Sequence, residues 1–269
     1  MPLITPPYSD IPTWTGDNYH DIALNGPAVT SSPDYTLHID GVTGERRKLH
    51  EFLERVADGA TALGAPEEVG GLGLKVNDGF VGIMSENCLD YPAIVYALFK
   101  IAVPISFIPS LLTPSESISL LRLSYATTLF VSPRLLPIAL AAAKQIGLSD
   151  DRIFVLGGRV PGRKSFSDLV ASVRAKAIPR IPAALVKDNT VAYMVFSSGT
   201  SGLPKGVLIS HKNIYTAVTQ ISVLLKRMIE IYQFSRRLTT HLKEYPFTWS
   251  YFLSTIRMWL SFCVFPSGN

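Results

Sequence analysis

One short segment combines the residue types that bind phosphate. Residues 197–206 read Ser-Ser-Gly-Thr-Ser-Gly-Leu-Pro-Lys-Gly and contain four hydroxyls, three glycines and one lysine. Glycines let main-chain amides approach an anion closely, hydroxyls donate hydrogen bonds to phosphate oxygens, and a lysine supplies a positive charge. Pro204 restricts the backbone directly before Lys205. The segment therefore predicts a phosphate-binding loop.

Two known loop motifs of similar composition are excluded by the spacing of the residues in this segment. The P-loop of nucleoside triphosphatases needs glycine directly before its lysine, where this chain has Pro204. A nucleophile elbow needs glycine at the position that Leu203 occupies after Ser201 and Gly202. A Ser/Gly turn in a hairpin, with Lys205 on its solvated edge, explains the composition equally well.

Alternating strands and helices position this segment. Apolar runs predict strands at 35–39, 80–84, 102–108, 127–131, 153–156, 191–196 and 207–209, and helical periodicity predicts helices at 49–63, 91–101, 135–146 and 166–175. Residues 113–116 read Thr-Pro-Ser-Glu, a capping box that predicts a further helix. This alternation predicts an α/β fold with a mostly parallel sheet flanked by helices, and such sheets bind ligands in loops beyond strand ends.

The segment from Phe196 to Val207 closely resembles the signature phosphate loop of the adenylate-forming superfamily. That superfamily includes acyl-CoA synthetases, 4-coumarate–CoA ligases, luciferases and the adenylation domains of peptide synthetases. Upstream segments at 39–63, 76–92 and 103–116 resemble the same family. Residues 35–216 are therefore similar to the first part of its large N-terminal, AMP-binding domain.

The resemblance implies an ATP site and an acid-activating reaction. In the family this loop holds the β- and γ-phosphates of ATP while a substrate carboxylate attacks the α-phosphorus. Carried over by position, the nucleotide-binding residues are Ser197, Ser198, Gly199, Thr200, Ser201, Gly202 and Lys205, and the catalytic contributions fall to Lys205 and Thr200. The resemblance also implies Mg²⁺ bound with ATP, a fatty or aryl acid as substrate, and coenzyme A as acyl acceptor.

The composition changes after Gln220. Residues 221–269 carry six Lys or Arg against two acidic residues, which accounts for the whole net charge of +4. They also lack the later motifs of the family. We expect an irregular leader over 1–34, a partial AMP-binding domain over 35–220 and an aberrant helical and aromatic tail over 221–269, which we interpret as a truncated or misread frame. A membrane span through 245–265 is disfavoured by Arg257 and its polar neighbours.

Together these observations predict a truncated AMP-forming acyl-activating ligase that retains the phosphate loop and is inactive as given. The alternative is a non-catalytic fragment that binds a nucleotide or a partner. Residues 1–220 hold 19 basic and 19 acidic residues, so a basic face for nucleic acid is not expected. The two distant cysteines and the absence of a signal-peptide pattern favour the cytoplasm.

Two smaller features are ambiguous in the sequence. His211 follows the strand after the phosphate loop, and it either contacts the nucleotide or caps the next helix. The basic run Arg46–Lys48 is interpreted as a solvated turn. The histidines and cysteines have no metal-ligand spacing, so no protein metal site is expected.

Overall fold

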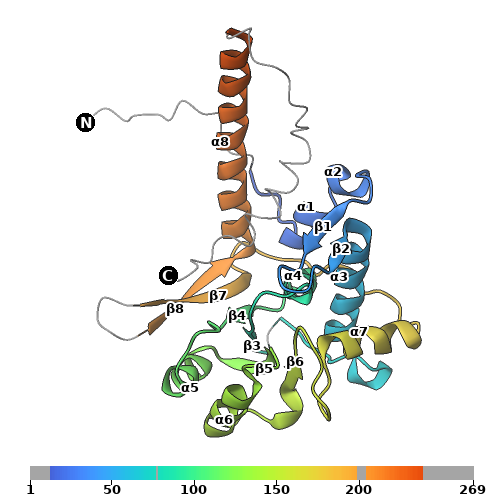
Figure 1. Ribbon diagram of the computed structural model, residues 1–269, viewed down its shortest axis with the longest axis vertical. Coiled ribbons are helices and arrows are strands. Elements are labelled where there is room, and N and C mark those ends of the chain that lie inside the picture. The colour runs from blue at the N-terminus through green and yellow to red at the C-terminus, as the bar shows by residue number, and fades with distance from the viewer. Residues whose placement is uncertain (1–12, 77, 199–203, 239–269) are drawn as a thin grey trace.

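The structure is a computed structural model that describes residues 13–76, 78–198 and 204–238. Its centre is a six-stranded sheet with the order β6-β5-β3-β4-β7-β8 (Figure 1). The strands are β3 (Phe80–Met84), β4 (Ile105–Phe107), β5 (Ala126–Val131), β6 (Ile153–Val155), β7 (Val191–Ser198) and β8 (Pro204–Ser210). All neighbouring pairs are parallel except β7 with β8. The mostly parallel α/β sheet expected from the sequence is confirmed.

Helices cover both faces of this sheet. On one face α3 (Leu49–Gly64) packs against α4 (Asp90–Lys100) and α7 (Phe166–Ala175), and on the other α5 (Pro114–Leu123) packs against α6 (Leu136–Ile146). Because successive strand residues point to opposite faces, a strand such as β5 contributes to both cores. Phe130 of β5 lies in the core with α3 and α4, whereas Leu129 and Val131 lie in the core with α5 and α6.

Local sequence signals set several helix ends. Thr113 and Glu116 exchange hydrogen bonds across the first turn of α5, so the expected capping box is formed. Ser165 and Asp168 do the same at the start of α7. Helix α6 ends at Gly147, whose φ of 80° lies in the left-handed region that glycine adopts without steric cost.

The segment expected to be an irregular leader contains two short helices, α1 (Tyr19–Leu24) and α2 (Pro27–Thr30). Asn18 caps α1 by accepting a hydrogen bond from the amide of His20. Tyr19 and Leu24 are buried, so this segment packs onto the body. The sequence did not reveal α1 because six residues are too few to show helical periodicity.

The basic run Arg46–Lys48 is strand β2, not a solvated turn, and it pairs antiparallel with β1 (Thr36–Ile39). Arg47 is buried because acidic partners on two helices neutralise its charge. The turn interpretation of this run was therefore wrong.

Helix α8 (His211–Leu238) follows β8 directly and extends away from the sheet (Figure 1). It passes residue 220 without a break, and the remainder of the expected tail lies outside the described residues. Within the described part of the chain, every helix is too short or too polar to cross a bilayer. Residues 245–265 lie outside the described part of the chain, so this finding does not extend to them.

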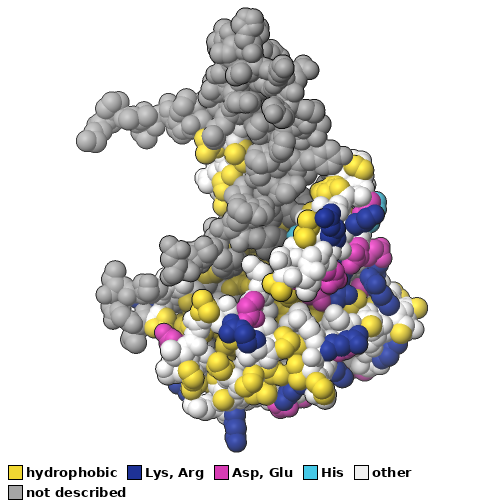
Figure 2. All heavy atoms as spheres, in the orientation of Figure 1, with side chains coloured by type: hydrophobic (Ala, Val, Ile, Leu, Met, Phe, Trp, Pro, Cys, Tyr) yellow, Lys and Arg dark blue, Asp and Glu magenta, His cyan; other side chains and the backbone are white. Residues whose placement is uncertain are grey.

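Charged side chains of both signs are interspersed on the face shown in Figure 2. Several ion pairs of the protein have both members exposed, such as Arg180 with Glu54, Arg134 with Glu86 and Arg152 with Glu67. Exposed pairs of this kind stabilise a protein by about 0–1 kcal/mol each. The two apolar cores therefore supply most of the stability of the body.

Candidate functional site

Strands β7 and β8 form an antiparallel hairpin that brings together the two ends of the predicted phosphate loop. The pairing runs from Val191 opposite Ser210 to Ser198 opposite Pro204. Ser197 lies directly opposite Lys205, and residues opposite each other in an antiparallel pair project from the same face. Both residues are exposed. A hydroxyl and an ammonium group can therefore reach the same ligand.

The hairpin lies where parallel sheets bind ligands. Strand β7 runs parallel to β4, so its carboxyl end lies at the same edge of the sheet as the carboxyl ends of the other parallel strands. Ligands of open α/β sheets bind at this edge. The position of Ser197 and Lys205 thus agrees with the position expected for a phosphate site.

The structure describes only part of the predicted site. It places Ser197 and Lys205 together, and it places the backbone of Ser198 at the end of β7. Gly199, Thr200, Ser201 and Gly202 lie outside the described residues. The roles assigned to all seven residues stay predictions, because a Ser/Gly turn would join the same hairpin.

Gly206 has a packing reason to be glycine. A Cβ atom built at this position would lie 2.8 Å from the sulfur of Met194 on β7. That distance is too short for two non-bonded heavy atoms, so a side chain at this position would force the Met194 side chain to move. Glycine at the position after Lys205 therefore leaves room for the Met194 side chain.

The other end of the hairpin is held by His211. Its backbone amide donates to the carbonyl of Thr190, at 3.1 Å, and its Nδ1 accepts from the amide of Tyr19, at 3.3 Å. Its ring meets Phe99 edge-on, with 5.7 Å between centroids. The side chain has no exposed surface, and burial lowers its pKa to about 4, so the imidazole is neutral at pH 7.

The two roles considered for His211 can now be compared with its surroundings. It is the first residue of α8, but the cap of that helix is made by Ser210 and Asn213, which exchange hydrogen bonds. The imidazole instead accepts from the first amide of α1. The sequence could not indicate this contact, because its partners lie 192 residues apart.

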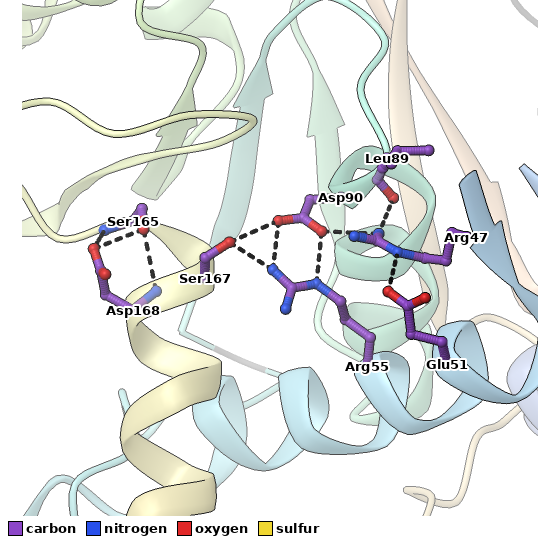
Figure 3. A network of polar contacts seen from close by, with 8 residues as sticks. All are labelled: Arg47, Glu51, Arg55, Leu89, Asp90, Ser165, Ser167 and Asp168. Carbon is purple, nitrogen blue, oxygen red and sulfur yellow. Dashed lines mark hydrogen bonds and ion pairs between the residues drawn. The ribbon is translucent and has the colours of Figure 1, made fainter. Parts of the chain in front are cut away.

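A buried charge cluster escaped the sequence analysis (Figure 3). The Asp90 carboxylate accepts from Nε and Nη2 of Arg55, both at 2.6 Å, and from Nη1 of Arg47 at 2.9 Å. The Ser167 hydroxyl also donates to it, at 3.0 Å. These residues come from α4, α3, β2 and α7, so one carboxylate joins four elements.

The arginines keep this carboxylate ionised. Burial alone would raise the pKa of Asp90, which is 8 % exposed. The hydrogen bond from Arg55 and the charges of Arg55 and Arg47 outweigh burial, so the pKa of Asp90 lies below its ordinary value. The cluster joins β2 with α3, α4 and α7, and we expect it to hold these elements together.

A cavity of about 210 Å³ lies at the amino end of β5, the opposite edge of the sheet from the hairpin. It is lined by Glu67, Leu72, Gly73, Leu74, Asp78, Thr127, Thr128 and Arg152. Its one complementary charge pair, Arg152 with Glu67, is already formed at 3.2 Å. Within the described parts of the chain, no three His, Cys, Asp or Glu residues come together to hold a metal ion.

A family model described as AMP-binding enzyme matches residues 28–260. The chain belongs to this family, as its resemblance to adenylate-forming enzymes predicted. The match passes both predicted domain boundaries, at residues 34 and 220. Those boundaries stay predictions.

Several curated relatives are named as CoA ligases. "Acyl-CoA ligase AFT1-1" of Alternaria alternata is 29% identical over 240 residues, which cover 84% of this chain and 40% of that protein. "4-coumarate--CoA ligase 5" of Oryza sativa subsp. japonica is 27% identical over 191 residues, which cover 70% of this chain and 32% of that protein. This chain spans about two fifths of the length of the first of these relatives.

Solved structures share the fold. A long-chain-fatty-acid-CoA ligase from Archaeoglobus fulgidus has a TM-score of 0.64 at 24% identity and covers 82% of this chain and 41% of its own. The anthranilate CoA ligase AuaEII, solved with anthranoyl-AMP, has a TM-score of 0.59 at 22% identity. The match covers 78% of this chain and 36% of the AuaEII chain. The α/β body is therefore that of the N-terminal domain of adenylate-forming enzymes.

Proposed function

We propose that this chain contains the ATP phosphate-binding part of an AMP-forming acid–CoA ligase. The observation that carries the proposal is the pairing of Ser197 with Lys205 at the two ends of a Ser/Gly/Thr loop, in a chain of the AMP-binding family. Relatives named as acyl-CoA and 4-coumarate–CoA ligases support a carboxylic acid as the other substrate. A fatty or aryl acid is the substrate class that we infer.

The proposed chemistry assigns distinct tasks to the loop residues. Lys205 donates a charged hydrogen bond to the phosphates of ATP, and the hydroxyl of Ser197 donates from the same face of the hairpin. By the family pattern, the amides and hydroxyls of residues 198–202 complete the site. When Mg²⁺ is bound with ATP it neutralises phosphate charge; the described residues of this chain offer it no cluster of ligands.

The reaction needs no enzyme nucleophile. A carboxylate oxygen attacks the α-phosphorus, the bond to the departing pyrophosphate breaks, and an acyl-adenylate forms. The thiolate of coenzyme A then attacks the acyl carbon and AMP leaves. The protein contributes by orienting the reactants and stabilising charge, and we assign both tasks to Lys205, which lies opposite Ser197 in the hairpin.

We further propose that the chain as given binds ATP without turning it over. It matches about two fifths of the length of a related ligase, and orientation of bound reactants contributes about 7–11 kcal/mol to such catalysis. A non-catalytic fragment that binds a nucleotide or a partner is the alternative. Membrane attachment through 245–265 is the weakest of the three.

Carboxylate-dependent exchange between ATP and pyrophosphate tests this proposal. The parent, Lys205→Ala and Lys144→Ala are assayed with a panel of fatty and aryl acids, and ATP retention is followed on the same samples by equilibrium dialysis. Lys144 is an exposed lysine in the last turn of α6 and serves as the matched control. We expect retention of ATP by the parent and the control, and no exchange above the Lys205→Ala background for any acid.

Two results would change the proposal. Exchange by the parent well above Lys205→Ala would show that the chain completes adenylation by itself. Failure of the parent to retain ATP would leave the partner-binding fragment as the better account.

A further inference from the structure

We propose that His211 is a positioning residue for Lys205. Its neutral imidazole ties helix α1 to the start of α8, and this contact fixes the strand that carries the lysine. The role assigned to His211 rests on the proposed function, since Lys205 matters as a phosphate ligand only there.

The imidazole acts as the cap of a remote helix. The first amides of a helix have no partner within it. In α1, the amide of His20 is satisfied by Oδ1 of Asn18, at 2.9 Å, and the amide of Tyr19 by Nδ1 of His211, at 3.3 Å. Accepting this bond requires an unprotonated Nδ1, which places the ring proton on Nε2.

Asn18, the residue before Tyr19, anchors the start of α1 to the body of the protein. The side-chain amide of Asn18 donates to the carbonyls of Phe99, Lys100 and Ala184, at 2.7, 3.3 and 3.1 Å. These bonds attach the start of α1 to the end of α4. The hydrogen bond from Tyr19 therefore connects His211 to the central body of the protein.

Packing alone does not account for a histidine at this position. Its Nε2 is buried and has no hydrogen-bond partner among the described residues. Burying a polar group in this way is unfavourable, and an apolar ring would fill the same space against Phe99 without that penalty. The Nδ1 acceptor is the property that an apolar ring lacks.

Strand β8 lies at the edge of the described sheet, and its junction with His211 is part of what anchors it to the body. Among the described strands, β7 is its one neighbour in the sheet. Residues from Pro204 to Leu208 are exposed. Besides its hydrogen bonds to β7, the strand is anchored near its carboxyl end, where Ile209 packs against the core and the chain continues into α8 at His211. Loosening this junction is expected to loosen the strand that carries Lys205.

Three variants distinguish the contribution of the Nδ1 acceptor from that of the aromatic ring. His211→Phe keeps an aromatic ring against Phe99 and removes the acceptor, whereas His211→Asn keeps an acceptor close to the position of Nδ1. His38→Phe is the matched control, because His38 also meets a phenylalanine edge-on and its buried Nδ1 has no partner among the described residues. If His211→Phe is not recovered folded, His211→Leu removes the same acceptor with a smaller side chain.

The readouts are amide hydrogen exchange in a peptide covering 204–210 without nucleotide, and ATP affinity. Loss of one hydrogen bond predicts exchange about three- to tenfold faster in that peptide for His211→Phe, with β3 unchanged. ATP affinity should fall by a similar factor. His211→Asn should restore both values to within about twofold of the parent, and His38→Phe should alter neither.

Unchanged exchange in His211→Phe, or equal damage in His211→Asn and His211→Phe, would overturn the positioning role. A parent that exchanges slowly in β8 but binds no ATP would overturn the proposed function instead, and with it the link between His211 and Lys205. The two failures are therefore distinguishable in one set of samples.

Discussion

Replacement of Asp90 by alanine tests whether the buried charge cluster holds the helical layer together. The carboxylate accepts three hydrogen bonds from Arg55 and Arg47 and a fourth from Ser167. Its removal leaves two guanidinium groups in a protein interior with fewer partners. Leaving one member of a buried ion pair without its partner destabilises a protein by about 3–5 kcal/mol.

The remaining contacts place the expected loss at the lower end of that range. Arg47 keeps Glu51, 3.2 Å from its Nε, and the carbonyl of Leu89. Arg55 keeps the Ser167 hydroxyl at 2.6 Å and lies over the ring of Phe166. We therefore expect Asp90→Ala to lower the free energy of unfolding by about 3 kcal/mol.

Urea denaturation at pH 7, followed by circular dichroism, measures this loss. The control is Asp150→Ala. It removes an ion pair of similar length, 2.8 Å between Asp150 and Arg163, and the Asp150 side chain is 72% exposed. Exposed pairs contribute about 0–1 kcal/mol, so the control should lose no more than that. The reasoning is refuted if Asp90→Ala and Asp150→Ala lose equal free energy.

Three further outcomes follow from the structure. Because the pKa of Asp90 is lowered in the folded state, the stability difference between parent and Asp90→Ala should be constant above the unfolded value of about 4 and should shrink as pH falls through the folded pKa, as urea titrations from pH 7 to pH 3 will measure. Asn18→Ala removes the donor to three backbone carbonyls and should lower the free energy of unfolding by about 1–3 kcal/mol in the same assay. Gly79→Ala should lower the melting temperature more than Gly147→Ala does, because both glycines have positive φ but only at Gly79 would a Cβ clash, 2.6 Å from the Thr127 methyl; equal shifts would contradict this.

The elements that the sequence predicted well depend on local signals. Strand β3 and helix α7 begin and end at the expected residues, because apolar periodicity and capping residues act within a few positions. The capping box at Thr113 was equally legible. The doubly covered sheet followed from the alternation of such elements.

The features that the sequence did not reveal depend on remote partners. Strand β2 is three residues long, and Asp90, one of the two carboxylates that neutralise Arg47, lies 43 residues away on α4. Helix α1 takes one cap from the adjacent Asn18, but its other cap comes from His211, which no local pattern can indicate. The candidate loop was evident from its composition, but the register that sets Ser197 opposite Lys205 required the structure.

Titration calorimetry of ATP tests most directly the claim that Lys205 binds its phosphates. The parent, Lys205→Ala and Lys144→Ala are compared at pH 7. A hydrogen bond to a charged group contributes about 1.5–3 kcal/mol, so Lys205→Ala should bind ATP about 10- to 150-fold more weakly than the parent, and Lys144→Ala should match the parent. Equal affinity of Lys205→Ala and the parent, or no binding by the parent, would contradict the assignment.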